Sequence, residues 1–160
     1  MTQNGLKPSV VIVDDEDMVI TSIRAFLQLE TDFEIRGFTD SQEAADYTVK
    51  HEVDVIVTDY LMPKLNGIQL LGKVKDAQPE TSRVLLTGHA DKQSAIQAIN
   101  EVSLFQYLEK PWDNSQLLLV VQSGAERSRL LRDLREKVGE LDSAHSTLKD
   151  VQRRLIQAFL

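Results

Sequence analysis

The strongest constraint on the fold is an alternation of two kinds of segment along the first 110 residues. Short apolar runs of the kind that form buried strands alternate with stretches whose apolar residues recur at helical spacing. These strand–helix repeats predict a parallel sheet that is covered by helices on both faces. The apolar runs comprise residues 10–13, 33–38, 53–58, 83–86 and 104–108.

A few residues mark where the helices between these runs begin. Asp40 and Asp91 stand where N-caps are expected, because a short acidic side chain can accept hydrogen bonds from a first helical turn. Gly67 marks the loop before the third helix. These signals place the segments that follow the apolar runs in loops, on one edge of the predicted sheet.

Polar side chains follow the apolar runs at the points where the predicted strands end. Asp14 and Asp15 follow the first run, Asp59 the third, Thr87 the fourth and Lys110 the fifth. Because the carboxyl ends of parallel strands share one edge, where ligands of such sheets bind, we expect these side chains to form one site. Acids at the end of a buried strand repel one another and lose solvation, so they need a nearby cation.

These residue types fit a magnesium ion that faces a phosphoryl group. Mg²⁺ prefers carboxylate oxygens and keeps some water ligands, and its charge offsets the repulsion among the acids. Asp59 is the candidate nucleophile, because carboxylates form aspartyl phosphates. Lys110 supplies a compact positive charge for a phosphate oxygen or for Asp59 itself, and Thr87 supplies a hydroxyl donor for a phosphate oxygen.

Four motifs in this order resemble the receiver domain of two-component response regulators. They are DD at 14–15, TDYLMPKLNG at 58–67, LLTGHAD at 85–91 and YLEKPWD at 107–113. The resemblance implies a receiver domain over residues 8–126 with a flavodoxin-like (βα)5 fold and the strand order 2-1-3-4-5. It also implies that a histidine kinase or a phosphotransfer protein phosphorylates the aspartate of the second motif, with Mg²⁺ as the cofactor.

The resemblance assigns the metal ligands position by position. Asp15 would bind Mg²⁺ directly and Asp14 through a water molecule. Asp59 would contribute a carboxylate oxygen, and the backbone carbonyl of Leu61 would complete the protein ligands. The expected metal site therefore draws on the loops after the first and third apolar runs.

The resemblance also assigns a switch. Thr87 would swing toward the phosphoryl group, Tyr107 would rotate inward behind it, and Lys110 would pair with the phosphate. The bond between Lys110 and Pro111 would be cis, an arrangement that is uncommon outside tight turns. The expected chemistry is limited to self-phosphorylation and autodephosphorylation, so the domain itself is not an enzyme with a separate substrate.

The C-terminal segment predicts one long helix. From Asp113 onward the sequence contains no proline and keeps a helical pattern almost to Leu160. About 47 residues of helix would span roughly 70 Å, too long to bury against a domain of this size. Leucines recur every seven residues beside a second column, which predicts a parallel two-stranded coiled coil over residues 127–160 and hence a homodimer. The expected core comprises Leu131, Leu134, Val138, Leu141, His145, Leu148, Gln152, Leu155 and Phe159.

Details of this helix leave alternatives open. Lys137 at a g position can pair with Asp142 at an e position of the partner, while His145 and Gln152 weaken the seam or fix its register. His145 also invites comparison with a phosphoacceptor histidine, but SAHSTLKD lacks the acid and proline pattern expected there, so we interpret it as a coiled-coil residue. The heptads could instead fold back on the receiver as a hairpin, although no Gly/Pro turn is available. Because the heptads still run at Leu160, we expect an output domain that this sequence does not contain.

Three functions compete at this point. The first is a phosphorylation switch whose state passes through Thr87, Tyr107 and the last helix to a dimeric coiled coil. The second is a magnesium-dependent phosphatase of the haloacid dehalogenase type, but that family requires an acid two residues after the nucleophile, where this chain has Leu61. The third is a phosphate-independent dimer adaptor, which the complete set of acidic residues disfavours.

Charge and composition exclude several other classes. Residues 1–126 carry 20 acids and 10 bases, so this part is a poor binder of nucleic acid, whose phosphates need clustered Lys and Arg. No apolar run reaches the 18 or more residues of a membrane helix, and the N-terminus lacks the apolar stretch of a signal peptide. Cysteine is absent, which excludes disulfides and cysteine-ligated metals. We therefore expect a cytoplasmic protein without direct contact to nucleic acid or membrane.

Overall fold

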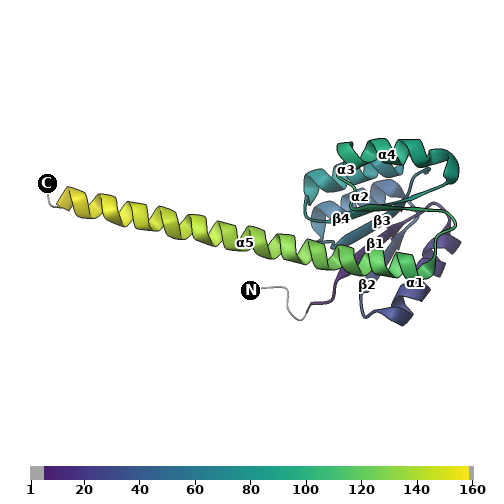
Figure 1. Cartoon of the computed structure of the whole chain (residues 1–160), viewed down its shortest axis with the longest axis horizontal. Helices are drawn as coiled ribbons and strands as arrows, with labels where there is room; N and C mark the ends of the chain where they lie inside the picture. Colours follow the sequence, from purple (N-terminus) through teal and green to yellow (C-terminus); the bar gives the residue numbers. More distant parts are fainter. Residues whose placement is uncertain (1–5, 159–160) are drawn as a thin grey trace.

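The computed structural model describes residues 6–158, which form a five-stranded parallel sheet between two layers of helices, with one helix extending far beyond it (Figure 1). The strand order is β2-β1-β3-β4-β5, and every neighbouring pair is parallel, which confirms the predicted sheet. The strands are β1 (Ser9–Val13), β2 (Glu34–Phe38), β3 (Val55–Asp59), β4 (Ser82–Thr87) and β5 (Gln106–Glu109).

Helices cover both faces of the sheet. Figure 1 shows α1 and α5 on one face and α2, α3 and α4 on the other. A single 3₁₀ turn, η1 (His89–Asp91), precedes α4. The helices are α1 (Asp17–Glu30), α2 (Ser41–Lys50), α3 (Gly67–Ala77), α4 (Lys92–Glu101) and α5 (Asn114–Ala158).

The central strands are apolar on both sides because each side faces a helical layer. Along β1, Val10 and Ile12 pack against α1 and α5, whereas Val11 and Val13 pack against the layer of α2, α3 and α4. All four side chains are fully buried. Among residues 6–158, no helix combines the length and apolar character that crossing a membrane requires.

The helix starts differ in part from the sequence-based expectation. Asp40 caps α2, accepting hydrogen bonds from the N–H groups of Gln42 and Glu43, as predicted. Asp91 precedes α4 without a side-chain capping bond, since the preceding 3₁₀ turn supplies the entry into that helix. The cap of α3 is Asn66, whose side chain forms a reciprocal capping box with Gln69.

Gly67 is the first residue of α3 rather than a loop residue. Its N–H donates to the carbonyl of Tyr60 at 2.7 Å, so the start of α3 lies against the end of β3. A Cβ at this position would lie 2.4 Å from the carbonyl oxygen of Asp59 and 2.8 Å from Leu85 Cδ1. Glycine is therefore required for this close approach of two backbones.

Helix α5 runs without interruption for 45 residues, and its C-terminal part extends well beyond the sheet (Figure 1). It does not fold back on the receiver as a hairpin. Its last buried side chains are Ser128 and Arg132, both within the segment expected to be coiled coil. We call residues 133–158 the tail.

The tail exposes the predicted seam. The side chains of Leu134, Val138, Leu141, Leu148 and Leu155 are between 48% and 69% exposed. Phe159, the last expected core residue, lies outside the described residues. An unpaired apolar stripe of this length fits the expected coiled coil, which stays a prediction.

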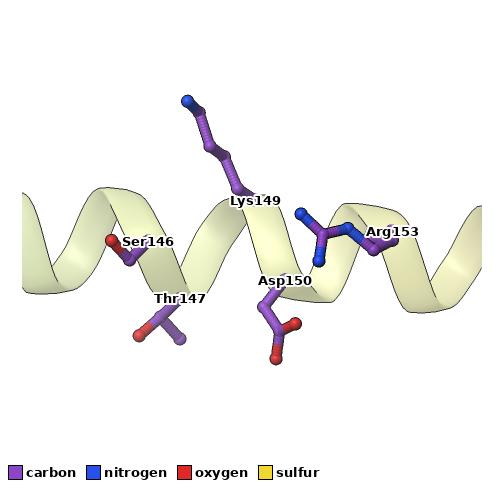
Figure 2. A pocket seen from close by; sticks show the side chains of 5 residues that line it. All are labelled: Ser146, Thr147, Lys149, Asp150 and Arg153. Atoms are coloured by element: carbon purple, nitrogen blue, oxygen red, sulfur yellow. The ribbon is translucent and has the colours of Figure 1, made fainter.

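Away from this seam the tail is polar. Figure 2 shows Ser146, Thr147, Lys149, Asp150 and Arg153 projecting from a single stretch of helix. The shallow hollow between them is helix surface rather than a ligand cavity, because all five residues belong to two turns of one exposed helix.

Candidate functional site

The predicted site residues lie where the sequence placed them, at the carboxyl ends of the strands. Asp59 is the last residue of β3 and Thr87 the last residue of β4. Asp14 and Asp15 directly follow β1, and Lys110 directly follows β5. The parallel register aligns these strand ends, so one edge of the sheet carries all five residues.

The three acids form one cluster. A single carboxylate oxygen from each of Asp14, Asp15 and Asp59 lies within 4.8 Å of the others. Asp14 is 1% exposed and Asp59 is 9% exposed, whereas Asp15 faces solvent. Such a set of oxygens from the ends of two neighbouring strands matches the ligand preference of a hard divalent cation.

Asp14 shows the strongest sign that a ligand belongs here. Its Oδ1 accepts a hydrogen bond from the N–H of Glu16 at 2.9 Å. Its Oδ2 is buried and has no hydrogen-bond partner among residues 6–158. Burial is the main reason that the pKa of Asp14 rises to about 6, and the nearby charge of Asp59 adds to the effect. The residues present therefore fit a magnesium ion, which would supply the missing partner and offset the repulsion.

Lys110 holds the phosphoacceptor candidate on the other side. Its Nζ donates to Asp59 Oδ1 at 3.0 Å. Burial acts to lower the pKa of Lys110, but the hydrogen bond to Asp59 and the charges of Asp59 and Asp14 outweigh it and raise that pKa. Asp59 Oδ1 also accepts from the N–H of Tyr60 at 3.0 Å. Within the described residues, Oδ2 is thus the oxygen left for a metal or phosphoryl group.

The two switch candidates lie on the neighbouring strands β4 and β5. Thr87 is fully buried, and its hydroxyl donates to the carbonyl of Leu108 at 3.5 Å rather than to Asp59. Tyr107 is half-buried against the layer of α2, α3 and α4. Their movement on phosphorylation stays a prediction.

Two further expectations concern the loops around the acids. The peptide bond between Lys110 and Pro111 is cis, as expected. The side chain of Leu61 is 60% exposed and carries no ligand atom, so the metal role expected at this position would fall to the backbone carbonyl. That role also stays a prediction.

Sequence reasoning missed a hydrogen bond beside the site. His89 Nδ1 lies 2.7 Å from Glu109 Oε1, which links the turn after Thr87 to the end of β5. The hydrogen bond from His89 lowers the pKa of Glu109. His89 is exposed, and the contact joins residues 20 positions apart, so no local pattern in the sequence signals it.

Comparison with known proteins agrees with this geometry. Residues 10–122 match the sequence model of the response regulator receiver domain. The hydrogenase transcriptional regulatory protein HoxA of Cupriavidus necator is 29% identical over 141 residues, which cover 88% of this chain and 29% of HoxA. The chain thus spans less than a third of the length of this regulator. The match favours the receiver over the haloacid dehalogenase-type phosphatase considered above.

Solved structures show the same fold. A response regulator receiver domain protein from Clostridium thermocellum is 31% identical with a TM-score of 0.71, covering 78% of this chain and 98% of the other. The signal receiver domain of an HD domain-containing protein from Pseudomonas fluorescens Pf-5 is 29% identical with a TM-score of 0.71, covering 76% and 97%. Sequence, fold and site geometry agree, and the chain belongs to the response regulator receiver domain family of two-component signal transduction.

Proposed function

We propose that this chain is a phosphorylation-controlled switch in which Asp59 accepts a phosphoryl group from a histidine kinase or a phosphotransfer protein. The observation that carries the proposal is the unpartnered buried oxygen of Asp14 beside Asp15 and Asp59, with Lys110 on the far side of the acceptor. Three clustered carboxylates next to a lysine suit the binding of Mg²⁺ together with an anionic phosphoryl group.

The transfer follows from the positions of the acceptor and its neighbours. A carboxylate oxygen of Asp59 attacks the phosphorus of a phosphohistidine, the P–N bond breaks, and the imidazole leaves with its electron pair. Asp14, Asp15, Asp59 and the carbonyl of Leu61 would hold Mg²⁺, which neutralises charge on the transferred oxygens when bound. Lys110 moves its hydrogen bond from the carboxylate to a phosphoryl oxygen.

The phosphorylated state is then carried away from the site. Thr87 turns its hydroxyl from Leu108 to the phosphoryl group, and Tyr107 fills the space behind it. Helix α5 carries the change to the tail, where Leu134 and its heptad neighbours pack against a second copy in a parallel coiled coil. The mechanism is a population shift between two states that the phosphoryl group biases.

The tail would connect this state to an output domain outside the present sequence. Support comes from the lengths of the relatives: the regulatory protein AtoC of Escherichia coli is 30% identical over 143 residues, and this chain spans only 29% of it. The segmentation into a receiver over residues 8–126 and a coiled coil over residues 127–160 belongs to the same proposal.

Intact mass measured after incubation with Mg²⁺ and acetyl phosphate tests the chemistry. The wild type should gain one phosphoryl group, and the gain should disappear without Mg²⁺ and in Asp59→Asn. The control variant is Asp76→Asn, because Asp76 is exposed, whereas Asp54 is buried away from the site and its replacement could disturb the fold. Asp76→Asn should gain one phosphoryl group as the wild type does. A folded wild type that gains no mass would make the phosphate-independent adaptor the better hypothesis.

A further inference from the structure

A buried polar cluster joins helix α5 to the sheet at the edge opposite the phosphoacceptor site. We call its four residues the clamp: Asp54, Ser82, Ser128 and Arg132. All four are at most 4% exposed. The helical half of the clamp lies beyond residues 10–122 and therefore outside the segment that the family model describes.

The first half of the clamp is a pair of hydroxyl groups. Ser128 Oγ accepts from the N–H of Ser82 at 3.0 Å and lies within hydrogen-bond distance of the carbonyl of Asp54. Ser82 Oγ donates to the carbonyl of Gly124 at 2.7 Å. A Cβ at Gly124 would lie 3.1 Å from the Ser82 side chain, so the helix lies directly on the start of β4.

The second half is the guanidinium of Arg132, which is 3% exposed. Its Nη1 pairs with Asp54 Oδ1 and its Nε with Glu52 at 2.9 Å. Its Nη2 donates to the carbonyl of Val53. The other oxygen of Asp54 accepts from the N–H of Ser9 at 2.8 Å, so the carboxylate ties β1 and α5 together.

Such an arrangement fixes geometry more than an apolar contact does. A buried charge is tolerated only when its partners lie in the right directions, and a guanidinium fork that is one turn out of place loses several bonds at once. Apolar packing would let α5 slide or tilt by small amounts. Directional partners on three neighbouring segments hold the helix in one phase and at one angle.

The position of the clamp gives this rigidity a consequence. Asp54 immediately precedes β3 and Asp59 ends it, so the clamp and the acceptor lie about 16 Å apart along one strand. The tail begins directly after Arg132 and extends for about 39 Å. A tilt of about 10° at the clamp would move the end of the tail by about 7 Å.

We propose that the clamp locks α5 to the receiver, so that the receiver and the tail move as one rigid lever in both signalling states. The inference rests on the proposed function and narrows it: phosphorylation changes how two receivers sit against each other, not the angle between a receiver and its own tail. Arg132 is a positioning residue in this scheme, and it touches no reacting atom.

A distance measurement within one chain tests the lever. The sequence contains no cysteine, so Lys73→Cys on α3 and Ser143→Cys on the tail give two unique sites for spin labels, both exposed. Labelled chains are diluted tenfold with unlabelled chains, so that a dimer rarely contains two labelled copies. Double electron–electron resonance then reports the distance between the two labels of one chain. Spectra are taken with and without Mg²⁺ and beryllium fluoride, a phosphoryl analogue.

The test variant is Arg132→Met, and the matched control is Arg153→Met. The two arginines are 21 residues apart and occupy the same heptad position, but Arg153 projects from the exposed helix (Figure 2). The wild type and Arg153→Met should show one narrow distance distribution that beryllium fluoride leaves unchanged. In Arg132→Met the distribution should become at least twofold broader.

Three results would overturn the lever. They are a wild-type distance that shifts with beryllium fluoride, an Arg132→Met distribution as narrow as the wild type, and equal broadening in Arg153→Met. Should Arg132→Met not fold, Ser128→Ala decides in the same way, because it removes a single hydroxyl that contacts Ser82, Asp54 and the carbonyl of Gly124. The same samples are also treated with acetyl phosphate, and their intact mass is measured. A sample that gains a phosphoryl group but fails the distance test separates failure of the lever from failure of the receiver chemistry.

Discussion

Lys110 Nζ lies 3.0 Å from Asp59 Oδ1, and the same oxygen accepts the N–H of Tyr60. Two donors on one carboxylate oxygen hold the acceptor in a fixed orientation and leave its second oxygen for chemistry. Lys110 is 37% exposed at its side chain, so solvent screens the pair and its worth to stability is small. Its larger effect is expected in the transfer step, where charge spreads over the phosphoryl oxygens.

Replacing Lys110 with Met should therefore slow phosphorylation by acetyl phosphate about 100-fold, the usual effect of removing one electrostatic stabiliser. Binding of Mg²⁺ should persist, because the acids stay in place. The rate is followed by intact mass over time at saturating Mg²⁺. Lys73→Met, an exposed change on α3, is the matched control and should react as the wild type does. A rate in Lys110→Met within twofold of the wild type would contradict this role.

Asp14 should make the metal-free protein less stable as the pH rises. Its pKa is raised to about 6 in the folded chain from an ordinary value of 3.8. Below about pH 4 the carboxyl is protonated in both the folded and the unfolded chain, and the folded chain keeps the proton more tightly. This contribution to stability is lost as the pH rises through about 6. Above that pH the carboxyl is ionised in both states, and only the folded chain bears the cost of a buried charge.

Asp14→Asn isolates that effect. Without Mg²⁺ the variant should be more stable than the wild type by about 1–3 kcal/mol at neutral pH, and the difference should vanish near pH 4. Urea unfolding at both pH values measures it, and magnesium titration should show weaker binding in the variant. Equal stabilities at neutral pH would mean that the buried Asp14 carboxylate carries no penalty.

Much of the fold and the site could be predicted because short sequence patterns indicate them. The apolar runs predicted the strands, and the residues after them predicted which side chains share an edge. Asn66 was missed because Gly67 beside it gave the more familiar loop signal. The pairing of Asp54 with Arg132 was missed because it joins residues 78 positions apart, and an arginine on a charged helix resembles a solvated residue.

Gly67 should not tolerate a side chain. Gly67→Ala would place a Cβ 2.4 Å from the carbonyl oxygen of Asp59, and a backbone atom cannot rotate away. We expect a loss of about 2 kcal/mol in the free energy of unfolding, as for other overpacked sites, together with slower phosphorylation. Gly139→Ala is the control, because nothing lies within 4 Å of its Cβ and alanine favours the helix by about 1 kcal/mol. Equal melting temperatures for the two variants would contradict the close approach.

The ion pair of Arg132 and Asp54 should behave as one unit in a double-mutant cycle. Arg132→Met should lower the free energy of unfolding by about 3 kcal/mol, because it leaves the buried Asp54 carboxylate without its main charge partner. The double variant Arg132→Met with Asp54→Asn should lose at least about 1 kcal/mol less free energy of unfolding than the two single variants lose in sum. Urea unfolding measures all four proteins, and Arg153→Met should stay within about 0.5 kcal/mol of the wild type. Strict additivity would show that the two groups do not interact.

Charge reversal in the tail tests the direction of the proposed coiled coil. In a parallel dimer, Lys137 of each copy faces Asp142 of the other, so the pair occurs twice. Lys137→Asp replaces two attractions with two repulsions and should weaken the dimer about tenfold, a change of about 1.4 kcal/mol. The double variant Lys137→Asp with Asp142→Lys should restore the wild-type dissociation constant.

Sedimentation equilibrium over a range of concentrations measures these constants. Arg153→Asp, on the polar side of the tail, should leave the constant within twofold of the wild type (Figure 2). Rescue is the informative step, because in an antiparallel pair g positions face g positions, and Lys137 would not meet Asp142. If Lys137→Asp weakens the dimer and adding Asp142→Lys does not restore it, the two tails are antiparallel. If the wild type is a monomer at every concentration, the proposed dimer is contradicted.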